Sequence, residues 1–497
     1  MALAQPVYRP RDAEHSVLHA VIRERLEDFL REAAARGEGA GLPRFIEREF
    51  REFLTCGVLA HGFARVRCDS CAFERLVPFS CKGRGFCPSC GGRRMTERAA
   101  HLVDHVLPRV PVRQWVLTVP YRLRYLLAWD HGLSRAVLDV YARALLGFYS
   151  RSARQSGIRR GRTGTLTVIQ RFGSGLNLNV HFHTLALDGV FSEDPPGGLE
   201  FHPAPPPSDE EVARVLATIR RGVRRLLARR GLEPGDEATG SPDRLAEESL
   251  SLSGIVSASV QGRVALGPRA GARVRRLGRE PDPEGVTSRG PRQAHLDGFD
   301  LHANVRVPAN DRARLEGLCR YVLRPPLAQD RLRLRADGRV LVKLKTAWHD
   351  GTSHLLFEPI EFLEKLAALT PRPEVNLLIY HGVLAPHAQW RRHVVAYGRE
   401  ATEDPDARTA GAGSAGTGPA SNGRYWAWAA LMRRAFEIDV LACPRCGGRL
   451  RLIATIDDPR VIRRILAHLG LPIEAPSPDP SRPPPGPTAD LFCDTAA

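Results

Sequence analysis

Alternation of apolar and polar side chains along residues 177–185 constrains the fold more than any other feature of this chain. A period of two predicts a β-strand, with Val180 and Phe182 on its apolar face. The polar face carries His181 and His183, one strand repeat apart. Two imidazoles so placed can bind one metal ion, although a half-exposed strand that carries two histidines by chance has the same pattern.

The balance of charges indicates a polyanionic partner. Lys and Arg number 72 against 55 Asp and Glu, which gives a formal net charge of +17. Nearly all of the basic residues are arginine, which makes two-pronged contacts to phosphate more readily than lysine does. GC-rich codon usage also favours arginine over lysine, but it does not explain the excess over acidic residues. We therefore expect a nucleic acid as the partner.

Length and hydropathy set the broad class. At 497 residues the chain exceeds one ordinary core, so several units are expected. No apolar run approaches the ~20 residues needed to cross a bilayer, and the amino terminus has no signal-peptide pattern. These features predict a cytoplasmic protein without a membrane segment. In a reducing compartment, the ten cysteines serve as metal ligands or free thiols.

Two Cys-x2-Cys pairs, Cys68/Cys71 and Cys87/Cys90, are separated by fifteen residues. This spacing predicts one tetrahedral zinc site with four thiolate ligands, which is structural because no position stays open for chemistry. Three nearby residues are alternative ligands or part of a second site: Cys56, His61 and Cys81. Four basic residues make this module a candidate for DNA binding: Lys82, Arg84, Arg93 and Arg94.

A third pair, Cys443 and Cys446, is half of a zinc ribbon without an obvious second half. Cys493 and His468 are the only late candidates for the missing ligands. Metal binding and free thiols are equally compatible with this pattern.

Composition divides the chain into four parts. Residues 1–110 are expected to form a helical, zinc-binding and DNA-binding module, and residues 111–400, which carry the histidine strand, are the candidate catalytic domain. Residues 401–424 have too little apolar side chain to fold and are expected to be a disordered linker. Residues 425–497 form a small segment like a zinc knuckle with a proline-rich tail. Flexible insertions are expected in the catalytic domain at 232–245 and 278–297.

Periodicity also predicts the main elements. Helices are expected over 13–55, 132–154 and 208–230, and strands over 113–120 and 165–171. A Ser-x-x-Glu capping box at 208–211 starts the last of these helices.

Tyr321 is the candidate nucleophile. It lies in a predicted helix that Pro325 ends. Three basic residues around it are candidates for binding phosphate: Arg320, Arg324 and Arg331. A phenol with a pKa near ~10 attacks poorly unless a metal and cations stabilise its charged form. The alternative is a helix tyrosine whose ring only packs.

Further blocks follow one another in order: Ser80-Cys81-Lys82, Cys87-Pro88-Ser89-Cys90, Trp115-Val116-Leu117-Thr118-Val119-Pro120, Leu301-His302-Ala303, Cys319-Arg320-Tyr321, Arg324-Pro325-Pro326-Leu327-Ala328 and Tyr380-His381-Gly382-Val383-Leu384-Ala385-Pro386-His387. Together with the histidine strand, they resemble rolling-circle transposases of the insertion sequence ninety-one family, within the His-hydrophobic-His (HUH) endonuclease superfamily. The resemblance covers roughly residues 15–400 and, weakly, 425–470.

With this resemblance, we expect an α+β fold. An HUH-type antiparallel sheet would carry the histidine strand at its centre, helices on its faces and the tyrosine helix across it, after a helical zinc module. The resemblance implies that His181 and His183 hold a catalytic Mg²⁺ or Mn²⁺, alongside structural Zn²⁺. The third ligand would be His302, slightly preferred, or Gln170. Tyr321 would attack single-stranded DNA and give a 5′-phosphotyrosine and a free 3′-OH.

Two departures and three alternatives stay open. Members with paired tyrosines carry one where this chain has Gly317, so the chain resembles the single-tyrosine branch. Tyr121 and Tyr125 have the four-residue spacing but follow the strand 113–120 instead of the histidine strand.

A replication initiator or relaxase would use the same chemistry. A zinc-dependent DNA-binding regulator would lack nuclease activity, and a metal phosphoesterase would use water, with a structural Tyr321.

Overall fold

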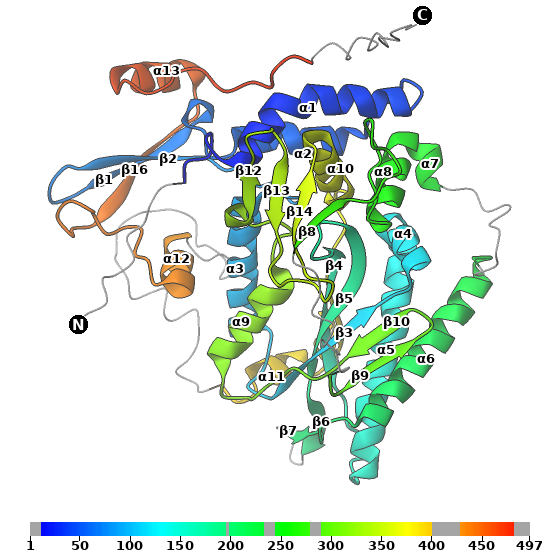
Figure 1. Cartoon of the computed structure of the whole chain (residues 1–497). Coiled ribbons are helices and arrows are strands. Elements are labelled where there is room, and N and C mark those ends of the chain that lie inside the picture. Colours follow the sequence, from blue (N-terminus) through cyan, green and yellow to red (C-terminus); the bar gives the residue numbers. More distant parts are fainter. Residues whose placement is uncertain (1–10, 195–197, 233–243, 279–289, 400–427, 482–497) are drawn as a thin grey trace, which may run out of the picture.

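A seven-stranded antiparallel sheet organises the chain (Figure 1). The computed structural model describes residues 11–194, 198–232, 244–278, 290–399 and 428–481. The strands in spatial order are β15 (Leu378–Gly382), β4 (Gly164–Phe172), β5 (Leu178–Leu187), β3 (Val112–Thr118), β10 (Phe299–His302) and β9 (Gln293–Leu296), with β11 (Arg306–Val307) also paired to β3. The predicted α+β class is confirmed, and the histidine strand β5 lies inside the sheet.

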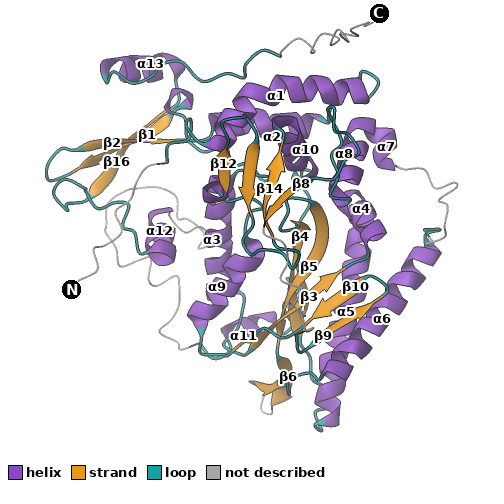
Figure 2. Ribbon diagram, viewed as in Figure 1, coloured by secondary structure: helices purple, strands orange, loops and turns teal. Residues whose placement is uncertain are grey.

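The two faces of the sheet are covered by different helices (Figure 2). On one face, Trp115 and Phe182 pack against α5 (His131–Gln155) through Phe148 and Tyr141. Helix α4 (Tyr121–Trp129) also lies against β5. The opposite face, which carries both histidines, is covered by α3 (Pro88–His105) and α9 (Arg312–Leu323). The strand alternation seen in the sequence therefore decides which side faces the core and which faces the candidate site.

Strand β9 falls inside the segment 278–297, which the sequence assigned to a flexible insertion. It pairs with β10 through a two-residue turn at Asp297 and Gly298, whose φ values are 49° and 77°. An Asp-Gly pair favours this turn because both central residues need positive φ. Residues 279–289 of that segment and residues 233–243 of the other expected insertion lie outside the described residues, as does the linker 401–424.

Helices and a second sheet complete the body. Helix α6 (Asp209–Arg229) begins with the predicted capping box and packs on α5, β9 and β10. The other elements of the body are α1 (Val17–Arg36), α2 (Arg44–Thr55), α7 (Arg244–Glu248), α8 (Leu250–Val260), α10 (Pro359–Leu369), α11 (Arg391–Ala396), η2 (Gln329–Arg331), the hairpin β6 (Gly189–Asp194) with β7 (Gly198–Pro203), and the sheet β12 (Leu332–Leu334), β13 (Val340–Lys343), β14 (Thr352–Phe357) and β8 (Arg275–Gly278). No helix in the described ranges is long and apolar enough to cross a bilayer.

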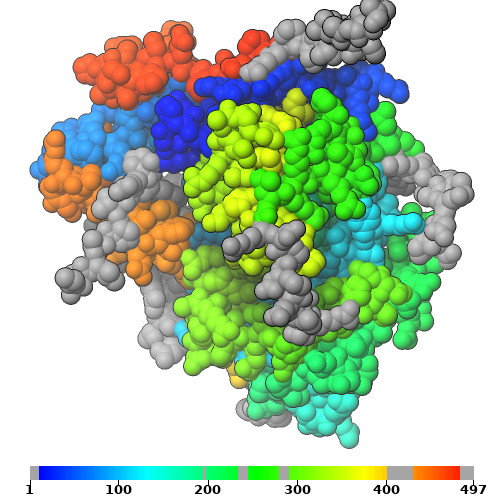
Figure 3. All heavy atoms as spheres, viewed as in Figure 1, coloured from blue at the N-terminus to red at the C-terminus, as the bar shows by residue number. Residues whose placement is uncertain are grey.

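A third sheet joins segments from opposite ends of the sequence. Strand β1 (Phe63–Cys68) pairs with β2 (Glu74–Pro78) on one side and with β16 (Leu450–Ile456) on the other. The 3-10 turn η1 (Leu59–His61) and helix α13 (Pro459–His468) pack beside this sheet, and α12 (Trp428–Phe436) contacts α3. In Figure 3 the orange and red carboxyl-terminal part lies against the blue amino-terminal part. Strand β16 therefore forms one sheet with the two strands of the amino-terminal module.

A buried ion pair supports the end of the central sheet, and its loss is expected to destabilise the protein strongly. Asp188 accepts from Arg113 at 2.8 and 2.9 Å, from Tyr149 at 3.1 Å and from Arg306 at 2.9 Å. Replacing Asp188 with alanine leaves the Arg113 charge buried and uncompensated, which costs about 3–5 kcal/mol. Urea unfolding followed by tryptophan fluorescence measures this loss, and Asp337→Ala is the exposed control.

Candidate functional site

The two histidines of β5 face each other at a distance that suits one metal ion. Nε2 of His181 lies 3.0 Å from Nε2 of His183, and both side chains are buried. Two ligand atoms ~2.1 Å from an ion and at right angles about it lie ~3.0 Å apart. The observed separation therefore matches two neighbouring positions of an octahedral divalent ion.

The other nitrogen of each ring has a partner that fixes the ring. Nδ1 of His181 lies 2.9 Å from the carbonyl oxygen of Asn179, to which it can only donate, so Nε2 keeps its lone pair. Nδ1 of His183 lies 2.9 Å from the amide of Gln114. A half-turn of that amide presents its oxygen to Nδ1–H and likewise frees Nε2. Gln114 was not among the residues selected from the sequence, because its proximity depends on the pairing of β3 with β5.

Burial keeps both imidazoles neutral. It lowers the pKa of His181 to about 4, and the nearby Arg324 and Arg124 guanidinium groups act in the same direction. It lowers the pKa of His183 to about 2, with further contributions from His181 and Arg324. A neutral imidazole is the form that binds metals, so the pair is in its ligand form at neutral pH.

Gln170 is better placed than His302 to complete the donor set. Gln170 lies directly opposite His181 in the β4–β5 register, and its Oε1 is buried without a hydrogen-bond partner. His302 pairs with Val116, which in turn pairs with His183, so a whole strand separates His302 from the histidines. Among the described residues, no third His, Cys, Asp or Glu joins the pair in a group whose ligand atoms lie within 4.8 Å. The preference for His302 is therefore not supported by the geometry, and the residues present fit a divalent ion through Gln170.

Tyr321 lies beside this pair, at the last turn of α9. Its ring centroid is 5.8 Å from that of His183, and the two ring planes meet at 89°. The residue is 40% exposed, whereas Cys319 and Val322 on the other side of the helix are buried in the core. The helix ends at Leu323, because the residue before Pro325 is disfavoured in helical conformation. The tyrosine thus has an accessible side chain next to the paired imidazoles.

Two cations flank the tyrosine ring. The guanidinium carbon of Arg324 is 4.3 Å from the ring centroid, and Nζ of Lys345 is 5.2 Å from it. Lys345 comes from the loop after β13 and had no signal in the sequence. All three predicted phosphate ligands also donate to backbone carbonyls: Arg324 to that of Tyr321, Arg320 to that of Ala435, and Arg331 to that of Lys343.

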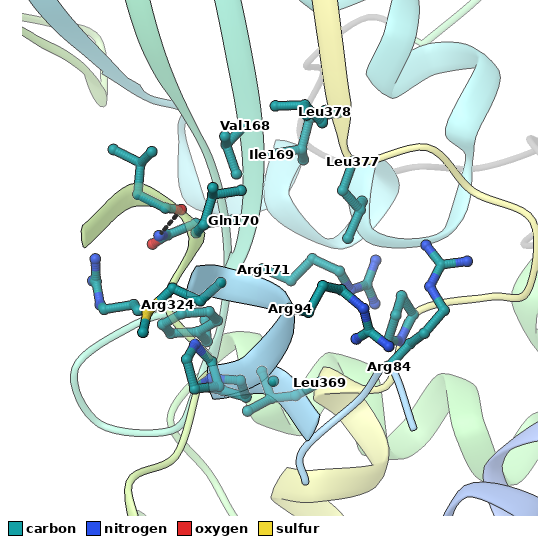
Figure 4. Close-up of a pocket in the computed structure, with 18 of the residues that line it drawn as sticks. Arg84, Arg94, Val168, Ile169, Gln170, Arg171, Arg324, Leu369, Leu377 and Leu378 are labelled. Carbon is teal, nitrogen blue, oxygen red and sulfur yellow. Dashed lines mark hydrogen bonds between the residues drawn. The ribbon is translucent and has the colours of Figure 1, made fainter. Parts of the chain in front are cut away.

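Gln170 and Arg324 also line a pocket that is rich in arginine (Figure 4). It lies between α3, β4 and the end of α9, and five arginines line it: Arg84, Arg94, Arg98, Arg171 and Arg324. No Asp or Glu is among the described residues that line it. Burial lowers the pKa of Arg171 to about 10, and burial together with Arg94 and Arg84 lowers the pKa of Arg98. Such crowding of cations without a carboxylate favours an anionic ligand.

Gln170 connects the pocket to the tyrosine helix. Its Nε2 donates to the carbonyl of Val322 at 2.7 Å, which is the dashed contact in Figure 4. Of the four basic residues predicted to bind DNA in the zinc module, Arg84 and Arg94 reach the pocket, and Arg93 is exposed on α3. The fourth, Lys82, has a φ of 56° and accepts from Arg94 through its carbonyl.

The cysteines form two clusters instead of the single predicted site. Cys87 and Cys90 lie with Cys56 and Cys81, and all four sulfurs are within 4.8 Å of one another. Cys68 and Cys71 lie with two distant cysteines, Cys443 and Cys446, in a second such group. The two Cys-x2-Cys pairs separate because Cys68 ends β1 whereas Cys87 caps α3. His61 belongs to neither cluster, and Cys493 lies outside the described residues.

Comparison with known families agrees with this architecture. Residues 21–119 match the family described as a transposase zinc-binding domain, and residues 164–392 match the family described as a putative transposase. No curated protein and no solved structure gives a match. The first match contains the Cys56 cluster, and the second contains the histidine pair, Gln170 and Tyr321.

An amino-terminal zinc-binding region followed by a transposase region defines a transposase, which is an enzyme that binds and processes DNA. The chain belongs with the insertion sequence ninety-one-like transposases. The zinc-binding match and the cysteine clusters support Zn²⁺ as a structural metal of this enzyme.

Proposed function

We propose that this transposase cleaves single-stranded DNA with Tyr321 as the nucleophile, as the first step of rolling-circle transposition. The observation that supports this most is the position of the tyrosine ring, 5.8 Å from His183 and partly exposed. A partly exposed tyrosine beside two neutral imidazoles differs from a tyrosine that only packs, because its side chain is accessible to a substrate phosphate.

In the proposed step, the phenol oxygen of Tyr321 bonds to phosphorus while the bond from phosphorus to the 3′ oxygen breaks. The phenol proton passes to solvent, and the 3′ oxygen takes a proton from water to become a 3′-OH. The phosphodiester energy is kept in the 5′-phosphotyrosine, so another 3′-OH can later reseal the strand without ATP. His181, His183 and Gln170 would hold a divalent ion, Mg²⁺ or Mn²⁺, which supplies Lewis-acid polarisation of the phosphoryl oxygen.

The cations around the ring stabilise the charges of this step. Arg324 and Lys345 both lie within 5.2 Å of the ring centroid. Positive charge there attracts the phosphate that the phenol attacks and stabilises the negative charge on its oxygens in the transition state. Because Arg324 also lines the pocket, one residue links the reacting phosphate to the arginine cluster.

The pocket suits the backbone of a single strand. Flexible single-stranded DNA can turn its phosphates into a cavity lined by arginines, whereas a stiff duplex presents them on a convex surface. The proposed strand therefore runs from Tyr321 past Gln170 and into the space bounded by Arg84, Arg94 and Arg98.

The proposal is tested with single-stranded oligonucleotides that carry element ends and a label on either side of the cleavage site. With Mg²⁺ or Mn²⁺, we expect an adduct that survives denaturation and carries the label from the 3′ side only. Cleavage without an adduct would indicate a phosphoesterase that uses water. Binding without cleavage would indicate a regulator.

Replacing Arg98 with alanine is expected to weaken binding of single-stranded DNA. Its guanidinium lines the pocket, so one phosphate contact is lost and the slope of log K against log salt falls by about 0.7. Fluorescence anisotropy across a salt series measures both quantities. Arg154→Ala is the matched control, because Arg154 is an exposed arginine on α5, beyond the opposite face of the sheet. Equal losses in the two variants would argue against a DNA path through the pocket.

A further inference from the structure

We propose that Cys68, Cys71, Cys443 and Cys446 bind a second zinc ion, and that this zinc holds the carboxyl-terminal segment against the helix of Tyr321. The zinc-binding family match ends at residue 119, so it covers only two of the four ligands. The part that concerns Tyr321 as nucleophile rests on the proposed function, whereas the metal site stands without it.

The sulfur positions suit tetrahedral zinc. Sγ of Cys68 lies 3.5 Å from Sγ of Cys446, and Sγ of Cys71 lies 3.6 Å from Sγ of Cys443. Four thiolates ~2.3 Å from a zinc ion in a tetrahedron lie ~3.8 Å from one another. The cluster therefore needs only a small expansion to hold the ion.

The two Cys-x2-Cys turns of this cluster have the same backbone hydrogen bonds at equivalent positions. In the first turn, the amide of Ala72 donates to the carbonyl of Cys68 at 3.2 Å, and the amide of Cys68 donates to Phe73 at 2.8 Å. In the second, Gly447 donates to Cys443 at 2.9 Å, and Cys443 donates to Gly448 at 2.7 Å.

The residue after the second cysteine is left-handed in both turns, with φ of 58° at Ala72 and 74° at Gly447. An alanine pays a conformational cost for this geometry that glycine does not. Two matching turns that face each other are what a zinc ribbon requires from its two halves.

The sheet formed by β1, β2 and β16 has an apolar core that is too small to stabilise it without a further cross-link. Among the described residues, the cluster around the cysteines fully buries Leu450 besides Cys68 and Cys443, with partly buried Val66, Phe73 and Leu441 packed on it, and the other end of the sheet buries Phe63, Ile462 and Leu466. On β16, Leu452 is 61% exposed and Ile453 is 47% exposed. Units with so small a core usually depend on a metal or a disulfide for stability.

The carboxyl-terminal segment reaches the tyrosine helix through α12. Arg434 of α12 forms ion pairs with Asp104 on α3 and, at 2.8 Å, with Glu316 on α9. From α9, Arg320 donates to the carbonyl of Ala435 at 3.3 Å. Glu316 and Arg320 both belong to the helix whose last turn carries Tyr321, so α12 supports that helix. We call these contacts of Arg434 and Arg320 the α12 brace.

The zinc cluster lies a few residues beyond this brace, at Cys443. With zinc bound, the chain after α12 is fixed to the amino-terminal hairpin, and Arg434 stays close to both acids. Without zinc, the ion pairs of Arg434 with Asp104 and Glu316 would have to hold α12 without the second anchor that the cysteines provide. Arg434 is thus a positioning residue for the tyrosine helix, and the second zinc keeps it in place.

Metal content of the full chain gives the first test, with zinc measured by mass spectrometry after dialysis. We expect two zinc ions per chain, and one in the double variant Cys443→Ser/Cys446→Ser. Arg445→Ser lies between the same two cysteines, is exposed, and should keep both ions. One zinc in the unmodified chain, or two in the double variant, overturns the proposal.

Hydrogen exchange tests the brace without using DNA chemistry. In the double variant and in Arg434→Gln, which should keep two zinc ions, amides of α9 should exchange about 10-fold faster or more. The rate of adduct formation should fall about 10- to 100-fold with little change in the oligonucleotide KM, because the tyrosine is displaced and binding is not. Unchanged exchange of α9 in both variants overturns the coupling. Absence of an adduct in the unmodified chain would instead count against the proposed function.

Discussion

Replacing Tyr321 with phenylalanine is expected to abolish the covalent protein–DNA adduct, a loss of roughly 10⁴-fold or more in cleavage rate. The phenyl ring keeps its edge contact with His183 and its place beside Arg324 and Lys345. Only the hydroxyl disappears, and with it the atom that bonds to phosphorus. Because the residue is 40% exposed, the fold should be as stable as before.

The assay is a denaturing gel of labelled single-stranded DNA incubated with enzyme and Mn²⁺. Tyr121→Phe is the matched control: that tyrosine is 45% exposed at the start of α4 and belongs to the pair with four-residue spacing. It should form the adduct at the normal rate. An adduct that persists in Tyr321→Phe and vanishes in Tyr121→Phe would move the nucleophile to the other helix.

Replacing His181 with alanine is expected to stop cleavage while leaving DNA binding nearly intact. Loss of one of the two facing imidazoles removes several kcal/mol of transition-state stabilisation, or roughly 10³-fold in rate. Affinity for single-stranded DNA comes mainly from arginine contacts to phosphates, so it should change by no more than about twofold. A comparable loss of binding would contradict the assignment of His181 to the catalytic ion.

Two further variants in the same assay locate the third ligand. Gln170→Ala should reproduce the loss of cleavage, because Gln170 is paired with His181 and its Oε1 has no other partner. His302→Ala should cleave normally, since Val116 separates it from His183. The opposite result would restore His302 as a ligand. Cleavage rates measured across a Mn²⁺ titration show whether each variant lost affinity for the metal or lost cleavage rate at saturating metal.

Local patterns in the sequence predicted the parts of the site that depend on local structure. The alternation around His181 gave the strand and its polar face, and the proline after Arg324 gave the end of the tyrosine helix. Both signals act within a few residues, where periodicity and backbone restriction decide the conformation. The Asp297-Gly298 turn was equally local, and its signal was missed.

Features that depend on pairing between distant segments could not be predicted in this way. A Cys-x2-Cys turn offers two ligands to any other such turn, so spacing alone favoured Cys87 and Cys90 as partners of Cys68 and Cys71. The pairing of β1 with β16 brings Cys443 and Cys446 there instead. Gln114 and Lys345 likewise become part of the site only through strand register and a loop that returns to the tyrosine.

The sheet formed by β1, β2 and β16 has a consequence for synthesis on the ribosome. Cys71 is translated 372 residues before Cys443, its partner in the cluster. At a synthesis rate of 5–20 residues per second, roughly 20 to 75 s pass between translation of Cys71 and of Cys443. During that time the β1–β2 hairpin has an unpaired strand edge and two cysteines without a bound metal. A message that ends early would release a polypeptide with that edge permanently open, and such a product should be prone to aggregation and proteolysis.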